Sequence, residues 1–241
     1  MAAIKTDKLR KEYKDVVAVE ELDLEIKEGE LFALLGVNGA GKTTTIKMLT
    51  GLTKPTSGDA FIYGHSVVGE PDAIKGMVDI STQETAVARK LTVEENIDFC
   101  AKIAGLEEAE AEAAKKRVTA QFGLEKVAKK QARKLSGGWQ RKLSVALALV
   151  TEPRVLFLDE PTLGLDVIAR RELWKAISSL KGKMTVILTT HYMEEAEALA
   201  DRIAVMINGR ITDIGTLGEL EEKTGKKGLE EVFIEIADRN R

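Results

Sequence analysis

Eight residues near the N-terminal end have the types and spacing of a phosphate-binding loop. They match the pattern G-x-x-x-x-G-K-[ST] at every fixed position and are Gly36, Val37, Asn38, Gly39, Ala40, Gly41, Lys42 and Thr43. In such a loop the glycines let backbone N–H groups turn towards a β-phosphate, the lysine reaches the β- and γ-phosphates, and the hydroxyl ligates Mg²⁺. The alternative is an ordinary strand-to-helix turn, which the full match disfavours. The loop therefore predicts a site for a nucleoside triphosphate with Mg²⁺.

Two adjacent carboxylates could complete this site. Asp159 and Glu160 follow the apolar run Val155–Leu158, which is typical of a buried strand. Such a strand can hold a carboxylate at its C-terminal end, where ligands bind in parallel sheets. Asp159 is then expected to hold Mg²⁺, directly or through water, and Glu160 to polarise the attacking water. Apolar runs that end in acids are common, so this assignment depends on the phosphate loop.

A third element, Leu135-Ser136-Gly137-Gly138, lies upstream of that strand. Ser136 offers a hydroxyl, Gly137 and Gly138 expose backbone N–H groups, and the N-terminus of the following helix would face an anion. A plain serine-capped helix is the alternative, and it would be preferred if the element stood alone. Beside a complete phosphate loop, the element favours a second nucleotide-binding surface and hence an ATP-driven dimer.

Apolar runs and turn residues predict the strands and the helix that carry these groups. Leu31–Leu35 is apolar throughout, as in a strand buried on both faces, and it leads through the loop into a helix from Lys42 to about Thr50. Asn208-Gly209 is a strong hairpin signal before Ile211–Ile214. The other expected strands are Ile4–Tyr13, Leu22–Lys27, Phe61–Tyr63, Met77–Ile80, Val155–Leu158, Thr185–Thr189 and Arg202–Ile207.

Residues 84–152 have a mostly helical pattern, which indicates a subdomain inserted into the sheet. Thr92 and Glu95 have the spacing of a capping box that opens a helix. Glu107–Gln121 is alanine-rich and charged, as in an exposed helix. After Ser136, apolar residues recur at helical spacing, namely Trp139, Leu143, Leu147 and Val150.

Length and composition suit a single domain over residues 1–241, with a C-terminal extension from about 216 to 241. Lys and Arg total 36 and Asp and Glu total 39, a formal net charge of −3. This balance gives no electrostatic reason to expect direct nucleic-acid binding. The single Cys100 cannot form an internal disulfide, which suits a reducing cytosol.

The chain shows no sequence signal for insertion into a membrane. Its most apolar stretch, Leu143–Val150, is far shorter than the roughly twenty residues that cross a bilayer. The first residues, Met1–Lys5, lack the hydrophobic region of a signal peptide. Any link to a membrane is therefore expected to run through a partner protein.

In type and order these motifs resemble the ATP-binding cassette (ABC) ATPases over nearly the whole chain. The resemblance implies an α/β fold of the P-loop NTPase class, with a mixed parallel core sheet, an antiparallel β-subdomain and an inserted α-helical subdomain. Leu135–Gly138 looks like the family's signature motif, which contacts the γ-phosphate held by the other subunit of a head-to-tail dimer. The commonest signature has glutamine after the two glycines, whereas this chain has Trp139 there.

Five further residues are assigned through this resemblance. Gln83 matches the glutamine that touches Mg²⁺ or the attacking water and links to the transmembrane partner. His191 matches the switch histidine, which would hydrogen-bond the γ-phosphate and help to orient the catalytic glutamate. Asp166 lies in the loop that crosses the dimer interface, and Tyr13 lies where the family stacks an aromatic ring on adenine. Thr44, directly after the phosphate loop, is also assigned to nucleotide binding.

The resemblance implies an ATPase, which converts ATP and water to ADP and phosphate and is coupled to transport. With one cassette and no membrane domain, two copies would join separately encoded transmembrane permease subunits on the cytoplasmic face of the cell membrane. The stretches Ser136–Trp174 and Leu229–Phe233 resemble two-component exporters of the ABC-2 type, including sodium- and drug-extrusion ATPases. Export is therefore favoured over import.

The alternative is a soluble mechanical ATPase of the ABC type that acts on ribosomes or nucleic acid. Ribosomal relatives usually carry two cassettes in one chain, and chromosome-type relatives split the cassette around a coiled coil. Neither feature is present, and the acidic balance argues against a nucleic-acid clamp. A GTPase is less favoured again because the chain has no Asn-Lys-x-Asp motif.

Overall fold

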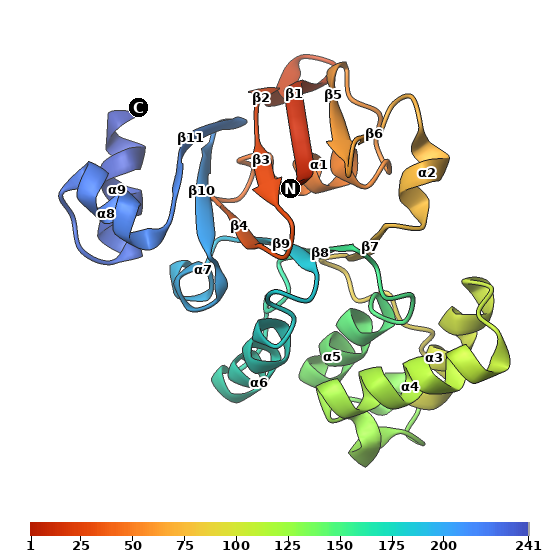
Figure 1. The fold of residues 1–241 in the computed structure, drawn as a ribbon. Helices are drawn as coiled ribbons and strands as arrows, with labels where there is room; N and C mark the ends of the chain where they lie inside the picture. Colours follow the sequence, from red (N-terminus) through yellow and green to blue (C-terminus); the bar gives the residue numbers. More distant parts are fainter. Residues whose placement is uncertain (241) are drawn as a thin grey trace.

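Two β-sheets face each other across an apolar core in the computed structural model, which describes residues 1–240 (Figure 1). The first sheet is antiparallel, in the order β2-β1-β5-β6, and β3 also pairs with β1. Its strands are β1 (Ala2–Tyr13), β2 (Val16–Leu22), β3 (Glu25–Lys27), β5 (Ser57–Ile62) and β6 (His65–Ser66).

The second sheet has six strands in the order β11-β10-β4-β9-β8-β7 and is parallel except for the antiparallel β10–β11 pair. Because the parallel strands point the same way, their C-terminal ends meet at one edge of the sheet. The strands are β4 (Leu31–Leu35), β7 (Val78–Ser81), β8 (Val155–Asp159), β9 (Thr185–Thr190), β10 (Arg202–Ile207) and β11 (Arg210–Gly215). This mixed sheet, with the antiparallel sheet beside it, confirms the predicted fold class.

Side chains that alternate along β4 belong to two separate cores. Phe32 and Leu34 pack with the antiparallel sheet and helix α1, whereas Leu31, Ala33 and Leu35 pack with the helices on the other face. The strand is therefore apolar at every position, as a strand covered on both faces requires. The helices are α1 (Lys42–Leu49), α2 (Pro71–Lys75), α3 (Val93–Ile103), α4 (Glu108–Phe122), α5 (Gly137–Leu147), α6 (Val167–Ser178), α7 (Met193–Leu199), α8 (Leu217–Thr224) and α9 (Leu229–Arg239).

Helices α3, α4 and α5 pack together at the β7 side of the parallel sheet, and α8 and α9 lie at its β11 side (Figure 1). The predicted capping box of α3 is present: Thr92 Oγ1 accepts from Glu95 N at 3.2 Å, and Glu95 Oε2 accepts from Thr92 N at 2.7 Å. None of the helices within residues 1–240 has both the length and the apolar character needed to span a bilayer.

Several predicted elements differ from the structure. The expected strand Leu22–Lys27 is instead the last residue of β2 and all of β3, with Asp23 and Leu24 between them; the Asp23 side chain accepts from Lys8 N at 2.7 Å at this break. The strand expected at Phe61–Tyr63 is the end of β5, since Tyr63, with a φ of 48°, already belongs to the turn. Helix α5 ends at Leu147, so Val150, which was expected in this helix, lies beyond its end. Helices α2, α6, α7 and α9 were not predicted.

The hairpin prediction at Asn208-Gly209 is confirmed. Both residues have positive φ angles, 48° and 81°, and they join the antiparallel strands β10 and β11. Two consecutive left-handed residues match the right-handed twist of the flanking strands. The turn therefore adds one antiparallel strand at the edge of the parallel sheet.

Candidate functional site

The phosphate loop connects the C-terminal end of β4 to α1. Its glycines are needed where the chain passes close to its neighbours: a Cβ at Gly36 would lie 2.4 Å from Met206 O, and one at Gly41, whose φ is 106°, would lie 2.4 Å from Ala18 O. Within the described residues, the backbone N–H groups of Asn38 and Gly39 donate to no acceptor. The loop therefore offers free donors beside the positive end of a helix, as an anion site requires.

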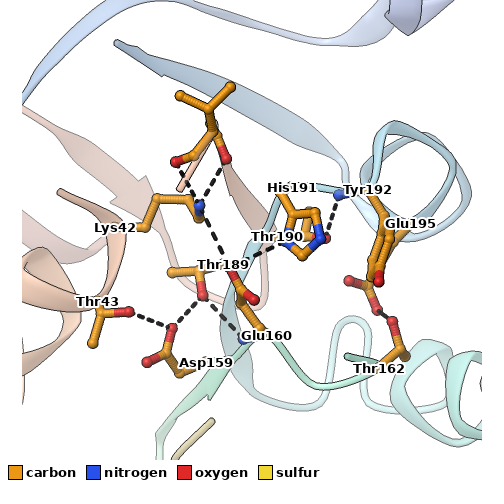
Figure 2. A network of polar contacts seen from close by, with 12 residues as sticks. Lys42, Thr43, Asp159, Glu160, Thr162, Thr189, Thr190, His191, Tyr192 and Glu195 are labelled. Atoms are coloured by element: carbon orange, nitrogen blue, oxygen red, sulfur yellow. Dashed lines mark hydrogen bonds and ion pairs between the residues drawn. The ribbon is translucent and has the colours of Figure 1, made fainter. Parts of the chain in front are cut away.

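The Lys42 side chain is buried beneath this loop. Its ammonium group donates to Gly36 O at 2.7 Å and to Val37 O at 3.1 Å, and it lies 3.5 Å from Glu160 Oε1 (Figure 2). Burial lowers the pKa of Lys42, while the nearby Glu160 and Asp159 carboxylates act in the opposite direction. A fixed cation thus lies close to the free N–H groups.

Asp159 ends β8 and joins the strand to the phosphate loop. Its Oδ1 accepts from Thr43 Oγ1 at 3.1 Å and from Thr189 Oγ1 on β9 at 2.5 Å. Because β8 and β9 are neighbouring parallel strands, with Asp159 paired with Thr189 in register, this contact follows from the sheet order. A hydroxyl and a carboxylate, both hard oxygen donors, are therefore adjacent beside the loop.

Glu160 is held in an unusual backbone conformation. Its φ is 46°, in the left-handed region that residues with a Cβ rarely adopt. Its N–H group donates to Thr189 O at 3.1 Å and to Thr189 Oγ1 at 3.0 Å, which fixes the bend directly after the strand. The carboxylate consequently turns towards Lys42 rather than continuing the alternation of β8 (Figure 2).

His191 lies next to Glu160 just after the end of β9. Its Nδ1 is 3.2 Å from Glu160 Oε1, but the two atoms do not have hydrogen-bond geometry, and this buried Nδ1 has no hydrogen-bond partner within the described residues. The adjacent Tyr192 N–H donates to Thr190 Oγ1 at 2.9 Å, which fixes the backbone after β9. The histidine is therefore close enough to influence the carboxylate.

A cavity of about 370 Å³ lies over these groups. The phosphate loop and Thr44 form one wall, and Gln83, Glu160 and His191 come from three other segments of the chain. Tyr13 is not among the lining residues; it is half-exposed at the end of β1, with Lys11 Nζ 4.9 Å from its ring centroid. The other predicted residues of this site adjoin the cavity through its lining: Asp159 contacts Thr43, and Gly36 and Val37 hold Lys42. The signature element and Asp166 lie outside it.

Ser136 is exposed at the N-terminal cap of α5 and does not line the cavity. Its side chain makes no capping hydrogen bond, unlike the plain serine cap considered as the alternative. Gly138 is required by close packing, because a Cβ there would lie 2.9 Å from Ala169 Cβ on α6. The helix N-terminus of the signature element is therefore open to solvent.

Asp166 caps α6. Its Oδ1 accepts from Ile168 N and Ala169 N, both at 2.9 Å. Around it lie exposed apolar side chains, and one of them, Ile168, is 73% exposed. We call Leu163, Val167 and Ile168 the apolar patch; it adjoins the signature element through the Gly138–Ala169 contact.

Three buried polar residues near the site were missed by the sequence interpretation. Thr189 holds both Asp159 and Glu160, and its signal was a threonine directly after the apolar run Val186–Leu188. Glu195 accepts from Thr162 Oγ1 at 2.8 Å and from Trp174 Nε1 at 3.1 Å, and burial raises its pKa. Arg141 on α5 had no local signal, because its partners are main-chain carbonyl groups.

Comparison with known proteins agrees with this geometry. The ABC transporter family model matches residues 19–163. The chain is 40% identical over 228 residues to the daunorubicin/doxorubicin resistance ATP-binding protein DrrA of Streptomyces peucetius, covering 94% of this chain and 69% of DrrA. It is 41% identical over 229 residues to the human phospholipid-transporting ATPase ABCA3, covering 93% of this chain but only 13% of ABCA3.

Two solved structures are similar across most of the chain. One is an ATP-binding subunit of an ABC transporter, with a TM-score of 0.87, 30% identity, and coverage of 98% of this chain and 99% of that one. The other is a dimeric ATP-binding cassette in a post-hydrolysis state with ADP and phosphate, with a TM-score of 0.80, 25% identity, and coverage of 89% and 98%. The chain therefore belongs to the ABC transporter family, in which it is an ATP-binding, ATP-hydrolysing cassette.

Proposed function

We propose that this cassette hydrolyses ATP with Mg²⁺ in sites shared between two head-to-tail copies, and that it drives a separate permease in export. Residues 1–241 would form one cassette, with 84–152 as its helical subdomain and 216–241 as its C-terminal extension. The observation that carries the proposal is the split site. The phosphate loop, Glu160 and His191 line one cavity of the chain. Ser136 of the same chain lies outside this cavity, and its hydroxyl makes no capping hydrogen bond.

The residues of the cavity suit MgATP. Lys42 and the loop N–H groups would bind the β- and γ-phosphates, and Thr44 lies on the same wall. Thr43 and Asp159 are hard oxygen donors whose oxygens lie 3.1 Å apart, and Gln83 supplies a further amide oxygen to the cavity, so these residues fit the preference of Mg²⁺. The metal would neutralise charge that develops on the phosphates.

Glu160 is the best-placed group to accept a proton from water. Its carboxylate faces the cavity, and its position is fixed by backbone bonds to Thr189. His191 would hydrogen-bond the γ-phosphate and hold the Glu160 carboxylate in place, since its Nδ1 is 3.2 Å away. Tyr13 remains our candidate for stacking on adenine.

The far side of the γ-phosphate would be completed by Ser136, Gly137 and Gly138 of a second copy. The apolar patch supports this dimer, because exposed apolar side chains that adjoin the signature element gain free energy when a partner covers them. Asp166, which caps α6, would cross the interface with the loop that precedes it.

A groove of about 280 Å³ on another face suits a permease segment. It lies between β7, α3 and α5 and is mainly apolar, with Ile80, Cys100, Ile103 and Leu147 in its lining. Ile103 is 71% exposed and Phe99, one turn earlier, is also exposed. An apolar helix from the permease would bury these side chains. The loop that contains Gln83 follows β7, so a movement of the permease helix would shift this loop and with it Gln83 at the nucleotide.

The groove also contains a carboxylate without a cationic partner among the described residues. Asp79 accepts from Ile80 N at 2.7 Å and from Thr151 Oγ1 at 3.4 Å. Burial raises the pKa of Asp79 from 3.8 to about 6. We therefore expect the permease segment to bring a basic side chain to the groove.

Asp79 makes the stability of the cassette depend on pH. Its pKa is higher in the folded chain than the unfolded value of 3.8, so the chain loses stability as pH rises from 3.8 to about 6, and the loss is complete above that pH. Asp79→Asn is expected to raise the free energy of unfolding by about 2–3 kcal/mol at pH 7.5 and about half as much at pH 5.0. Urea unfolding at both pH values measures this, and an equal gain at both would contradict the assignment.

The relatives favour the transporter over the ribosome-acting alternative. A resistance ATP-binding protein and a phospholipid-transporting ATPase are both similar over more than nine-tenths of this chain. Because resistance is consistent with removal of a toxic compound, the DrrA relative supports export. The permease would hold the cassette at the cytoplasmic face of the cell membrane.

Association with the permease can be tested in native membranes. Ile103→Asp should reduce the amount of cassette that co-purifies with a multi-helix membrane protein by about tenfold or more, because it places a charge in an apolar contact. The ATPase rate of the isolated cassette should stay within about twofold, since Ile103 does not line the nucleotide cavity. Ile234→Asp on α9, another exposed isoleucine, is the matched control. Equal membrane association of both variants, or capture of ribosomes instead, would contradict the proposal.

A further inference from the structure

Arg141 is a buried cation whose hydrogen-bond partners are all main-chain carbonyl groups. It lies in α5, one turn after the signature glycines, and is 4% exposed. Within the described residues it makes no ion pair closer than 4 Å with a carboxylate, although Asp159, Glu195 and Glu160 act on it through space. Burial lowers the pKa of Arg141. A buried charge is costly, and here the carbonyl groups stabilise it. The role of Arg141 is therefore to be sought in the segments that supply these carbonyl groups.

These carbonyl groups come from two separate segments. Nη1 donates to Thr82 O at 2.6 Å and Gln83 O at 3.1 Å, in the loop after β7. Nη2 donates to Asp159 O at 2.7 Å and Glu160 O at 2.8 Å, and Nε donates to Pro161 O at 2.7 Å. A guanidinium group has five N–H donors, and here five carbonyl groups accept from it.

The two segments carry Gln83 and Glu160, which both line the cavity and which the proposed function places beside the attacking water. The carbonyl groups of Gln83 and Glu160 are both bound by one rigid, planar group, so the backbone positions of the two residues are fixed relative to each other. Glu160 also has the left-handed φ of 46°, which persists only where neighbouring bonds hold it. Thr189 holds its N–H group and Arg141 holds its carbonyl group.

We propose that Arg141 is a positioning residue for hydrolysis. It fixes the positions of Glu160 and Gln83 relative to each other and makes these positions depend on that of α5, the helix that begins with the signature glycines. The inference rests on the proposed function, because it takes Glu160 as the base and Ser136–Gly138 as the far-side phosphate contact. Arg141 and the signature glycines belong to the same helix. A shift of α5 when a second copy binds is therefore transmitted to both water-facing residues at once.

Lysine cannot replace this group. It has three donors on one nitrogen and no planar fork, so it cannot bind both segments as arginine does. Arg141→Lys is expected to lower kcat by about 10- to 100-fold while the KM and Kd for ATP change by less than about threefold, since the phosphate loop is untouched. Because it keeps the phosphate loop and the signature, the variant should accumulate as an ATP-bound dimer on size exclusion, as Glu160→Gln should.

The experiment compares Arg141→Lys and the uncharged Arg141→Gln with Ser144→Ala. Ser144 lies on the same helix, and its hydroxyl is 3.1 Å from Ser81 Oγ on β7, so the control breaks another buried α5–β7 contact. It should retain kcat. Rates are expressed per bound nucleotide, so that a loss of folded protein does not count as a loss of turnover.

Two results would overturn the proposal. A wild-type kcat per bound nucleotide in Arg141→Lys and Arg141→Gln would show that neither segment needs the guanidinium group. A failure of both variants to bind ATP would assign Arg141 to folding instead. Glu160→Gln is measured in parallel: normal hydrolysis by that variant would refute the base assignment separately, whatever the Arg141 variants do.

Discussion

Replacing Glu160 with glutamine is expected to slow ATP hydrolysis by about 100- to 10,000-fold and to leave ATP binding nearly unchanged. Glutamine keeps the size of the side chain but cannot accept the proton from water. The phosphate loop does not depend on this carboxylate, because the Lys42 ammonium is also held by two carbonyl groups of the loop. The bound nucleotide should therefore persist.

A persistent nucleotide should also stabilise the dimer, because ATP would link the loop of one copy to the signature of the other. Phosphate release measures turnover, a fluorescent ATP analogue measures binding, and size exclusion with ATP measures the dimer. Glu152→Gln, an exposed glutamate paired with Arg117, is the matched control and should behave as wild type. A monomeric Glu160→Gln variant with unchanged turnover would refute the role of Glu160.

Ser136→Arg is expected to abolish hydrolysis while each monomer still binds ATP with an unchanged Kd. Ser136 is exposed, its hydroxyl makes no capping bond, and it does not line the cavity of its own chain. The larger side chain would therefore leave the phosphate loop of the same chain undisturbed. It would instead fill the space that the γ-phosphate of a second copy must approach.

The matched control for this variant is Ser178→Arg, which adds the same side chain at an exposed position near the end of α6. Nucleotide titration and phosphate release on both variants separate binding from turnover. If Ser136→Arg loses ATP binding as a monomer, the signature acts within its own chain. If it hydrolyses ATP at the wild-type rate, the signature has no part in the reaction.

Features encoded by consecutive residues could be predicted from the sequence. The loop before α1, the acids after β8 and the turn between β10 and β11 each depend on a few neighbouring positions. Helix α6 was missed although it has comparable local signals, since Asp166 is an N-cap residue and Leu173 and Ile177 recur at helical spacing.

Features that depend on the order of the strands could not be predicted. Thr189 contacts Asp159 because β9 pairs with β8 and lies between β8 and β4 in the sheet. This strand order cannot be read from the sequence of either strand. Arg141 is recognised by carbonyl groups, which every residue has, so its partners leave no trace in the sequence. The packing of Trp139 could not be predicted either: it is half-buried, and Lys142 Nζ lies 4.6 Å from its ring centroid.

The central claim, that each site is built from two copies, is tested most directly by mixing two inactive variants. In a dimer of Ser136→Arg with Lys42→Ala, one site joins an intact phosphate loop to an intact signature, and the other has neither. Each variant alone should be inactive, and the mixture should recover up to about a quarter of the wild-type rate, from half the dimers with one of two sites. A mixture as inactive as its components, although the two chains dimerise, would contradict the claim.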